Sequence, residues 1–498
     1  MLSAAPCMPT DAAEARLRDA VHPPSWINPE PRGRYDLVVI GGGTAGLVSA
    51  IGAAGLGARV ALVERGLLGG DCLNTGCVPS KALLRSARAA AEARRAPELG
   101  VRVTGVDADF AAVMGRMRER RADISPHDSA ERLRDAGVDV YFGDARFASP
   151  SAIAVGDRTL TFGRAVIATG GRAAVPPIPG LAAVPYLTNE TLFAISEQPR
   201  RLAILGAGPI GCEMAQAFGR LSTAVTLIGR EAQVLPNEDA DAAAIVARRL
   251  TADGVTLRLG ATVTRISKSR GGIEIEGSAG RQACDQLLVA TGRTPNIEEL
   301  DLAAAGVAFD THGVVVDDRL RTANRRVFAA GDVCSRFKFT HAADALARIV
   351  IQNALFFGRK RASALVIPWC TYTDPEVAHV GMYEDEAHRA GRRVETITIP
   401  LADVDRAVVD EERDGFVRVH HERGRLLGCT VVASRAGEMI GVATHALTHG
   451  DSLAQLGATI QPYPTLTHAF RAAGDAYGRT RLTPPRRRLL QRYFRLFR

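Results

Sequence analysis

The sequence predicts an α/β protein with two Rossmann-like dinucleotide-binding domains. Two observations support this fold class. A short apolar segment that runs into the pattern G-x-G-x-x-G occurs twice, at residues 35–46 and 201–211, each time followed by a small-residue helical segment and a second apolar segment. The chain has 498 residues, 46% of them hydrophobic, which is enough for two to four domains.

The first glycine pattern predicts a dinucleotide site. The apolar segment 35–40 has the character of a buried parallel strand and is followed by Gly41, Gly43 and Gly46. Such glycines allow a tight turn and a close approach of the backbone to a pyrophosphate at the helix N-terminus. Glu64 ends the second strand, 23 residues after Gly41, where a carboxylate can bind a ribose 2′-hydroxyl.

The second glycine pattern, at Gly206, Gly208 and Gly211, predicts a second dinucleotide site with a different preference. The position equivalent to Glu64 is Gly229, and Arg230 follows it. An arginine at this place can pair with a 2′-phosphate, so we expect NADPH to be preferred over NADH, although NADH remains possible. The alternative is that Arg230 is a solvated surface residue.

Three further apolar segments end in glycine turns. They are 165–171, 287–293 and 326–333, and they supply the candidate cofactor-binding residues Thr169, Gly170, Gly292, Gly331 and Asp332. Asp332 directly follows one of these turns, where it can hold a hydroxyl group of a sugar alcohol. Two dinucleotide sites in one chain suggest a flavoprotein that a nicotinamide reduces.

Two cysteines lie five positions apart in the segment "GGDCLNTGCVPSK", residues 69–81. In a regular helix residues i and i+5 are roughly 8 to 9 Å apart at Cα, whereas a disulfide spans no more than about 7 Å. If Cys72 and Cys77 are bridged, the segment between them must depart from helix, and we expect helix to resume at Ser80 with Pro79 near its first turn. Cys77 would lie near that N-terminus, where the helix dipole lowers the pKa of a thiol.

The other cysteines are widely spaced, which excludes a disulfide framework and fits a reducing compartment. No secretory signal or membrane span is expected, because the N-terminus has no apolar core and the uncharged segment 37–58 contains seven glycines. We therefore expect a cytoplasmic protein. The isolated core or surface cysteines are Cys7, Cys212, Cys284, Cys334, Cys370 and Cys429.

The positive charge is confined to the C-terminal tail. The formal net charge is +8, and residues 478–498 contain eight arginines and no acidic residue, so the rest of the chain is formally neutral. This distribution gives no indication of nucleic-acid binding. Within the tail, "PPRRRLLQRYFRLFR" has apolar residues at helical spacing, which is typical of a basic helix on the inner, anionic face of a membrane. A helix packed on a dimer and a disordered tail are the alternatives.

The segment "GGDCLNTGCVPSK" resembles the active-site motif of the class I pyridine nucleotide–disulfide oxidoreductases. The resemblance extends from Tyr35 to about Arg481 and follows the order of that family: an FAD cradle, two redox cysteines, a nicotinamide cradle, "AAGD" and then "TYTDPEVAHVG", which looks like the start of a dimerisation domain. It implies a homodimer with FAD and NAD(P)H as cofactors and a C-terminal α+β dimerisation domain. The implied divisions are an N-terminal extension (1–33), the FAD-binding domain (34–180), the NAD(P)H-binding domain (181–295), the second part of the FAD-binding or central domain (296–364), the dimerisation domain (365–478) and the basic tail (479–498).

The resemblance also implies roles for individual residues. Cys72 and Cys77 would form the redox-active disulfide, with Cys77 next to the flavin and Cys72 facing the substrate. Lys81 and Glu213 match the ion pair that the family places beside the reactive nitrogen of the flavin. The tyrosine that usually covers the nicotinamide pocket is Pro209 in this sequence.

The sequence departs from the disulfide reductases at its C-terminal motif. Tyr463 stands where they have the catalytic histidine, and His468 stands where they have the glutamate that orients it. Because an unperturbed tyrosine has a pKa near 10, it is a poor base at neutral pH, whereas it can donate a hydrogen bond or, as a phenolate, help to hold a metal ion.

A tyrosine at this position resembles mercuric reductase. However, the sequence has neither a GMTC-x-x-C domain before the flavin domain nor a vicinal cysteine pair after Cys429. We therefore expect a mercuric-reductase-like enzyme that passes electrons to a metal ion or a small oxidant, with no resident metal site. The alternatives are a dihydrolipoyl dehydrogenase or other disulfide reductase, and a membrane-surface flavoprotein that reduces a quinone or a protein partner.

Overall fold

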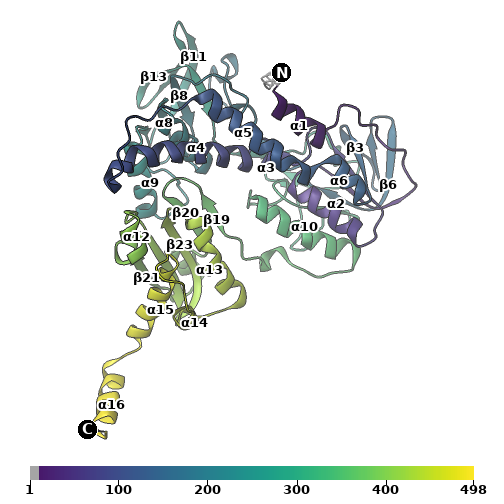
Figure 1. Ribbon diagram of the computed structural model, residues 1–498. Helices are drawn as coiled ribbons and strands as arrows, with labels where there is room; N and C mark the ends of the chain where they lie inside the picture. The colour runs from purple at the N-terminus through teal and green to yellow at the C-terminus, as the bar shows by residue number, and fades with distance from the viewer. Residues whose placement is uncertain (1–10, 498) are drawn as a thin grey trace. The chain divides into compact units, whose positions relative to one another are not determined.

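The computed structural model describes residues 11–497 (Figure 1). The chain divides into two compact units: one comprises the residues up to Pro236 together with Leu250–Leu365, and the other comprises Asn237–Arg249 and Val366–Arg498. Of the sequence expectations, Cys7, the first residues of the N-terminal extension and the last residue of the basic tail, Arg498, lie outside the described residues.

The largest sheet of the first unit has seven strands in the order β3-β2-β1-β6-β5-β4, with β18 also paired to β6. Alternate residues of β1 enter two different cores: Leu37 and Val39 pack on one face, and Val38 and Ile40 on the other. Both faces are therefore buried, as expected for a mostly parallel sheet. The strands are β1 (Tyr35–Ile40), β2 (Val60–Glu64), β3 (Val138–Phe142), β4 (Ala145–Ser149), β5 (Ala152–Val155), β6 (Arg158–Ile167) and β18 (Val327–Ala329).

Helices cover this sheet and carry the segment that contains the cysteine pair. The glycine-rich loop leads from β1 into α2, and α10 packs beside α2. The helical elements of this part are α1 (Ala12–Val21), α2 (Thr44–Gly55), α3 (Gly70–Asn74), α4 (Cys77–Arg95), η1 (Ala96–Leu99), α5 (Phe110–Ile124), η2 (Ser125–Asp128), α6 (Ala130–Asp135) and α10 (Thr340–Leu355).

A second parallel sheet in the same unit has the order β10-β9-β8-β14. Its strand β8 runs through the second glycine loop into α8, which repeats the arrangement of β1 and α2. The strands are β8 (Arg201–Leu205), β9 (Ala224–Ile228), β10 (Thr256–Arg258) and β14 (Gln286–Val289). The other elements are β7 (Gly171–Ala173), η3 (Leu181–Ala183), α7 (Asn189–Leu192), α8 (Pro209–Arg220), β11 (Val263–Ser269), β12 (Gly272–Gly277), β13 (Gly280–Cys284), β15 (Arg293–Pro295), β16 (Phe309–Asp310), β17 (Gly313–Val314) and η4 (Ala362–Ala364).

The second unit is built on a five-stranded antiparallel sheet in the order β19-β20-β23-β22-β21. Helices α14 and α15 approach closely, because Gly457 and Gly474 face each other and a Cβ on Gly474 would lie 2.4 Å from the backbone nitrogen of Gly457. The elements are α9 (Ala240–Ala252), β19 (Trp369–Thr371), β20 (Glu376–Gly381), α11 (Glu384–Arg389), β21 (Glu395–Pro400), η5 (Leu401–Asp403), α12 (Asp405–Val409), β22 (Phe416–Glu422), β23 (Arg425–Ala433), α13 (Ala436–His449), α14 (Leu453–Ala458), α15 (His468–Thr480) and α16 (Pro484–Arg495).

Polar contacts attach segment 237–249 to this antiparallel sheet. The carboxylate of Glu238 accepts hydrogen bonds from Trp369 Nε1 at 2.9 Å and from the Tyr383 hydroxyl at 2.7 Å. Arg418 forms an ion pair with Asp239 at 2.8 Å. These bonds explain why this stretch of chain groups with the second unit although the sequence analysis assigns it to the NAD(P)H-binding domain, a division that stays a prediction.

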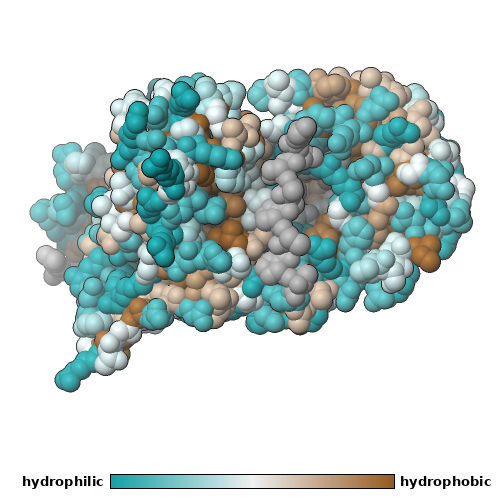
Figure 2. All heavy atoms as spheres, turned by 90° about the horizontal axis from the view of Figure 1, so that it is seen from above, coloured by the Kyte–Doolittle hydropathy of each residue, from teal (hydrophilic) through white to brown (hydrophobic). Residues whose placement is uncertain are grey.

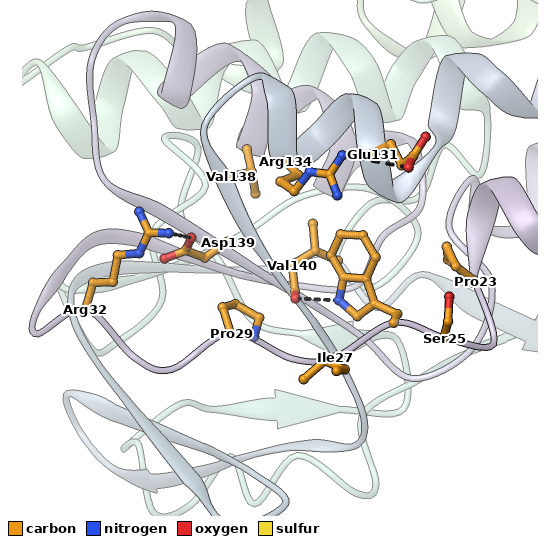
Figure 3. A pocket seen from close by; sticks show the side chains of 11 residues that line it. Pro23, Ser25, Ile27, Pro29, Arg32, Glu131, Arg134, Val138, Asp139 and Val140 are labelled. Carbon is orange, nitrogen blue, oxygen red and sulfur yellow. Dashed lines mark hydrogen bonds and ion pairs between the residues drawn. The ribbon is translucent and has the colours of Figure 1, made fainter.

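A segment of the N-terminal extension lies along the outer strand β3 of the large sheet. Trp26 Nε1 donates to Val140 O at 3.2 Å. Asn28 donates to Phe142 O and accepts from Phe142 N, both at 2.8 Å. The segment and the strand enclose a cleft of about 340 Å³, which Pro29, Arg32 and Arg134 help to line (Figure 3).

The face shown in Figure 2 is mostly hydrophilic, and its apolar side chains are scattered in small patches. Across residues 11–497, none of the helices combines the length and the apolar character that crossing a membrane requires. The α/β fold class with two dinucleotide-binding domains, expected from the sequence, is confirmed.

Candidate active site

The first glycine loop has a backbone that only glycine can adopt. Gly41 has a φ of +103°, and a Cβ on it would lie 2.4 Å from Ala168 O. A Cβ on Gly46 would lie 1.8 Å from Gly41 O, so helix α2 packs directly on the loop. No side chain caps α2 at Gly43. Its first amide groups therefore suit the pyrophosphate of a dinucleotide such as FAD.

Glu64 ends β2 beside this loop. Its Oε2 accepts a hydrogen bond from Gly42 N and its Oε1 accepts one from Gly66 N, each at 2.6 Å. Burial raises the pKa of Glu64, and the two backbone hydrogen bonds oppose this rise. Each carboxylate oxygen can accept a second hydrogen bond, so the residue fits the hydroxyl groups of a ribose.

The second loop has nearly the same backbone. Gly206 has a φ of +109°, and a Cβ on Gly211 would lie 1.8 Å from Gly206 O. A Cβ on Gly208 would meet no atom within 4 Å, which leaves room at the N-terminus of α8 for a phosphate. Arg230 follows β9 with 83% of its side chain exposed, and its Nη2 lies 3.0 Å from Glu231 Oε1. The arginine predicted to select NADPH is thus paired with its acidic neighbour.

The other glycine turns gather around Arg293. This residue donates to Gly171 O at 2.7 Å and to Asp332 Oδ2 at 3.2 Å, and it also pairs with Asp71, which precedes Cys72. Burial raises the pKa of Asp332, and the charge of Arg293 opposes this rise. The arginine therefore links the turn that follows β18 to the segment that carries the cysteines.

Thr169, Gly170, Gly292 and Gly331 form the turns themselves. Thr169 Oγ1 donates to Asn296 O at 2.7 Å, and Asn296 N donates to Gly170 O at 3.0 Å. Gly331 has a φ of +82°, and a Cβ on it would lie 3.2 Å from the Cβ of Ala45 in α2. Gly292 has a φ of +140°. These turns lie in the same unit as the first glycine loop.

Cys72 and Cys77 lie on either side of a break between two helices. Helix α3 ends at Asn74, and α4 begins at Cys77. The expectation that helix resumes at Ser80 is wrong by three residues, because Ser80 N already donates to Gly76 O at 3.1 Å and so closes the first turn. Pro79 is accommodated because the first N–H groups of a helix have no intrahelical partner.

Both cysteines are thiols in this structure, and their surroundings differ. A hydrogen bond from Cys72 lowers the pKa of Cys77, and Thr340 and Lys81 lower it further, against the effect of burial. The same interaction, together with burial, raises the pKa of Cys72. Of the two thiols, Cys77 is therefore the more acidic. Thr340, the first residue of α10, lies 3.4 Å from Cys77 Sγ.

Lys81 follows Cys77 by one helical turn in α4. Its Nζ lies 2.8 Å from Oε2 of Glu213, a buried residue of α8. The ion pair thus joins the helix that carries Cys77 to the helix of the second glycine loop. It is the contact that the family resemblance implied for these two residues.

Three residues of this arrangement were missed by the sequence analysis. Asp71 and Arg293 lie inside segments that the analysis quoted, but no local pattern connects residues 222 positions apart. Thr340 lies 263 positions from Cys77 and carries no motif signal of its own.

Tyr463 and His468 lie together in the second unit. Tyr463 is 70% exposed, and its hydroxyl donates to Asp405 Oδ2 at 2.8 Å. This hydrogen bond raises the pKa of Tyr463, so the residue is a neutral phenol at physiological pH. His468 begins α15, its ring contacts Tyr463 edge-on with centroids 6.2 Å apart, and its Nδ1 is buried without a hydrogen-bond partner among the described residues.

Among residues 11–497, no group of three or more His, Cys, Asp or Glu side chains is placed to hold a metal ion.

The family model for pyridine nucleotide-disulphide oxidoreductases matches residues 35–347, and the model for the dimerisation domain of the same family matches residues 367–473. The chain belongs to this family. It is an oxidoreductase with FAD and NAD(P)H as cofactors, and its dimerisation domain supports a homodimer.

Two relatives with the same sequence identity to this chain are named for different activities. The chain is 34% identical over 472 residues to a mercuric reductase of Bacillus cereus, covering 93% of this chain and 75% of the relative. It is also 34% identical over 453 residues to a dihydrolipoyl dehydrogenase of Thermus scotoductus, covering 89% and 97%. Overall identity therefore does not separate these two activities.

A solved structure shows the same fold. The Cu(II) complex of the HOCl-induced flavoprotein disulfide reductase RclA from Escherichia coli has a TM-score of 0.80 and 30% sequence identity, covering 88% of this chain and 98% of that one. The family, the fold and the cofactors predicted from the sequence are thus confirmed.

Proposed function

We propose that the chain is an NADPH-dependent flavoprotein whose Cys72–Cys77 pair delivers electrons to a thiophilic metal ion or a small oxidant. The observation that supports this proposal most strongly is the place of Cys77 at the start of α4, 3.4 Å from Thr340 Oγ1, where Cys72, Thr340 and Lys81 lower its pKa. With Cys77 at the N-terminus of α4 and Cys72 beside it, the two thiols can be oxidised to a disulfide and reduced again.

Each residue has a distinct part in the proposed reaction. When bound, FAD accepts a hydride from NADPH and supplies two electrons for the disulfide. Cleavage of the S–S bond by two electrons and one proton yields the Cys77 thiolate and the Cys72 thiol. Lys81 stabilises negative charge at the centre, and buried Glu213 orients the ammonium group through their 2.8 Å contact.

The remaining site residues are proposed to bind the cofactors. Gly41, Gly43 and Gly46 would hold the FAD pyrophosphate, with Glu64 at a ribose and Asp332 at the ribityl chain. The NADPH pyrophosphate would lie at Gly206, Gly208 and Gly211, with Arg230 at the 2′-phosphate. The turns at Thr169, Gly170, Gly292 and Gly331 would let the backbone approach the cofactors.

Tyr463 favours a metal ion over a disulfide substrate. A disulfide reductase needs a base for the leaving thiol, whereas the raised pKa of Tyr463 keeps its hydroxyl protonated. A soft metal ion binds thiolates directly and releases no thiol. One relative, a mercuric reductase, agrees with this preference. The RclA structure holds Cu(II), although that protein is named a disulfide reductase. The family resemblance implies that Tyr463 of the partner subunit completes the site.

The test is anaerobic NADPH oxidation by the purified holoenzyme with Hg²⁺ and excess thiol, beside Cu²⁺, glutathione disulfide, lipoamide and a water-soluble quinone. We expect metal-dependent NADPH oxidation that Cys72→Ser and Cys77→Ser abolish. Turnover with a disulfide but not with a metal would replace the proposal by a disulfide reductase. Quinone reduction that survives both serine variants would replace it by a flavoprotein in which the dithiol is secondary.

A further inference from the structure

Helix α16 is a C-terminal helix whose every side chain is at least partly open to solvent. It contains no buried residue, and Figure 1 shows it beyond α15, away from the sheet of its unit. Its apolar residues are among the more exposed of the described chain, with Leu489 at 67% and Phe494 at 56%. Neither the proposed reaction nor the packing of the second unit accounts for these side chains.

The apolar and basic residues of α16 occupy largely opposite faces. At 3.6 residues per turn, each residue advances about 100° around the helix. The apolar residues then share one face of about 140°, and the polar residues lie on the other, except for Arg486 in the first turn, which donates back to Arg481 O at 3.2 Å. The apolar face holds Leu489, Leu490, Tyr493 and Phe494, and the polar face holds Arg487, Arg488, Gln491, Arg492 and Arg495.

The aromatic rings continue past the end of the helix. Tyr493 contacts Phe494 and Phe497 with ring centroids 5.6 and 4.9 Å apart. Leu496 and Phe497 are 82% and 73% exposed. In aqueous solution, an exposed apolar surface of this kind usually marks the binding site of a partner whose surface is also apolar.

The charge of the tail restricts what that partner can be. Residues 478–498 contain eight arginines and no acidic residue, and none of the arginines of α16 forms an ion pair with a described residue. The partner must therefore be anionic on one side and apolar just beneath. Nucleic acid would neutralise the arginines but leave the leucines and aromatic rings in water, whereas an anionic bilayer satisfies both faces.

We infer that α16 lies in the interface of an anionic lipid bilayer, with its apolar face in the headgroup–acyl boundary and its arginines at the lipid phosphates. Twelve residues make a helix of about 18 Å, too short for a hydrocarbon core of about 30 Å, so the helix lies flat and does not span. The reductase would thereby be held peripherally at a membrane surface.

The experiment is sedimentation of the full-length holoenzyme with phosphatidylcholine vesicles that contain 30% phosphatidylglycerol or none. We expect binding to the anionic vesicles at least tenfold tighter than to the neutral ones, weakened by raised salt, and lost when the chain ends at Thr483. Equal pelleting of the full and shortened proteins would overturn the inference.

A pair of variants separates lipid insertion from simple charge attraction. Leu490→Ser with Phe494→Ser keeps every arginine and should weaken binding at least tenfold, whereas Gln491→Ser on the polar face should bind as the natural protein does. Retained binding by the double variant would overturn insertion of the apolar face. NADPH-driven flavin reduction, unchanged in all variants, verifies that each is folded.

Two other occupants of the apolar face are also tested. In one outcome, light scattering shows the shortened protein as a monomer, and the full-length dimer does not bind vesicles. The apolar face then packs on a second copy of this chain, and the inference fails. Tighter binding to an oligonucleotide than to anionic vesicles would likewise replace the bilayer by nucleic acid.

Discussion

The two glycine loops of the first unit have almost the same backbone and different surroundings. Their N-cap glycines, Gly43 and Gly208, have φ and ψ values within one degree of each other, at −79° and −173° against −78° and −172°. In both loops a Cβ on the last glycine would lie 1.8 Å from the carbonyl oxygen of the first. The backbone that receives a pyrophosphate is thus the same twice.

The loops differ where the second strand of each ends. Glu64 is the last residue of β2, and its carboxylate accepts hydrogen bonds from Gly42 N in the glycine loop and from Gly66 N. After β9 stands Arg230, which is largely exposed and pairs only with its neighbour Glu231 among the contacts seen. Under the proposed function, both glycine loops receive a pyrophosphate, and the residue at the end of the second strand distinguishes the FAD site from the NADPH site.

The largest effect is expected when the last glycine of each loop is replaced by alanine. Gly46→Ala and Gly211→Ala both drive a methyl group into a backbone oxygen, so the helix must shift from the loop. We expect Gly46→Ala to lose FAD, with at least a hundredfold weaker binding (about 3 kcal/mol), as measured by flavin absorbance after gel filtration. Gly211→Ala should keep FAD but lose reduction by NADPH.

Gly55→Ala in α2 is the matched control, because a Cβ there meets no atom within 4 Å. Its flavin content and its reduction by NADPH should equal those of the natural protein. If Gly46→Ala retained its flavin, the close packing of α2 on the first loop would not be needed for binding.

The next effect concerns the ion pair between Lys81 and Glu213, which joins helix α4 to helix α8. Lys81→Met leaves the buried Glu213 without its 2.8 Å contact. Since Lys81 is about a third exposed, we expect a loss of about 2 kcal/mol in the free energy of unfolding, less than for a fully buried pair. Flavin reduction in stopped flow should slow at least tenfold. Arg85→Met, one turn further along α4, should change neither quantity.

A smaller effect is expected at Arg230, which distinguishes the end of β9 from the end of β2, where Glu64 stands. Arg230→Ala should raise the KM for NADPH about tenfold, the equivalent of about 1.4 kcal/mol, and leave the KM for NADH unchanged. Steady-state kinetics with both nucleotides measures the ratio of the KM for NADPH to the KM for NADH. Arg200→Ala serves as the control for loss of a positive charge. An unchanged ratio would make Arg230 an ordinary surface arginine.

The smallest effect concerns a third helix N-terminus, that of α4, where the thiol of Cys77 follows the N-cap glycine Gly76. Because the pKa of Cys77 is lowered, its thiolate persists below the ordinary thiol pKa of about 8.5, and alkylation of the reduced protein should slow only as the pH falls through this lowered value. The lowered pKa of Cys77 contributes stability that is lost as the pH falls through this value, whereas the raised pKa of Cys72 contributes stability that is lost as the pH rises above the ordinary thiol pKa.

Thr340→Val removes a hydrogen bond to Cys77 and should therefore raise its pKa. We expect alkylation below the midpoint to slow about threefold. Ser335→Ala, in the turn before α10, is the control, because the Ser335 hydroxyl accepts its hydrogen bond from Phe337 N. An unchanged pH profile for Thr340→Val would mean that Cys72 and Lys81 alone hold the thiolate.

Much of this site could be predicted from the sequence because its signals are local. Each glycine loop lies within six residues, and the strands around it are short apolar runs. Helix α4 begins three residues earlier than the sequence predicts, because the hydrogen bond from Ser80 N to Gly76 O closes a first turn that contains Pro79. Contacts such as Thr340 with Cys77 and Arg293 with Asp71 depend on the packing of distant strands, which no local pattern encodes.

The segment that lies along β3 has a consequence beyond the local contacts of Trp26 and Asn28. Their side chains occupy the outward carbonyl of Val140 and both backbone groups of Phe142 on the outer strand of the largest sheet. An outer strand without such cover is a template on which another molecule can add a strand and begin to aggregate. The side chains of Trp26 and Asn28 thus keep copies of this flavoprotein from pairing edge to edge along β3.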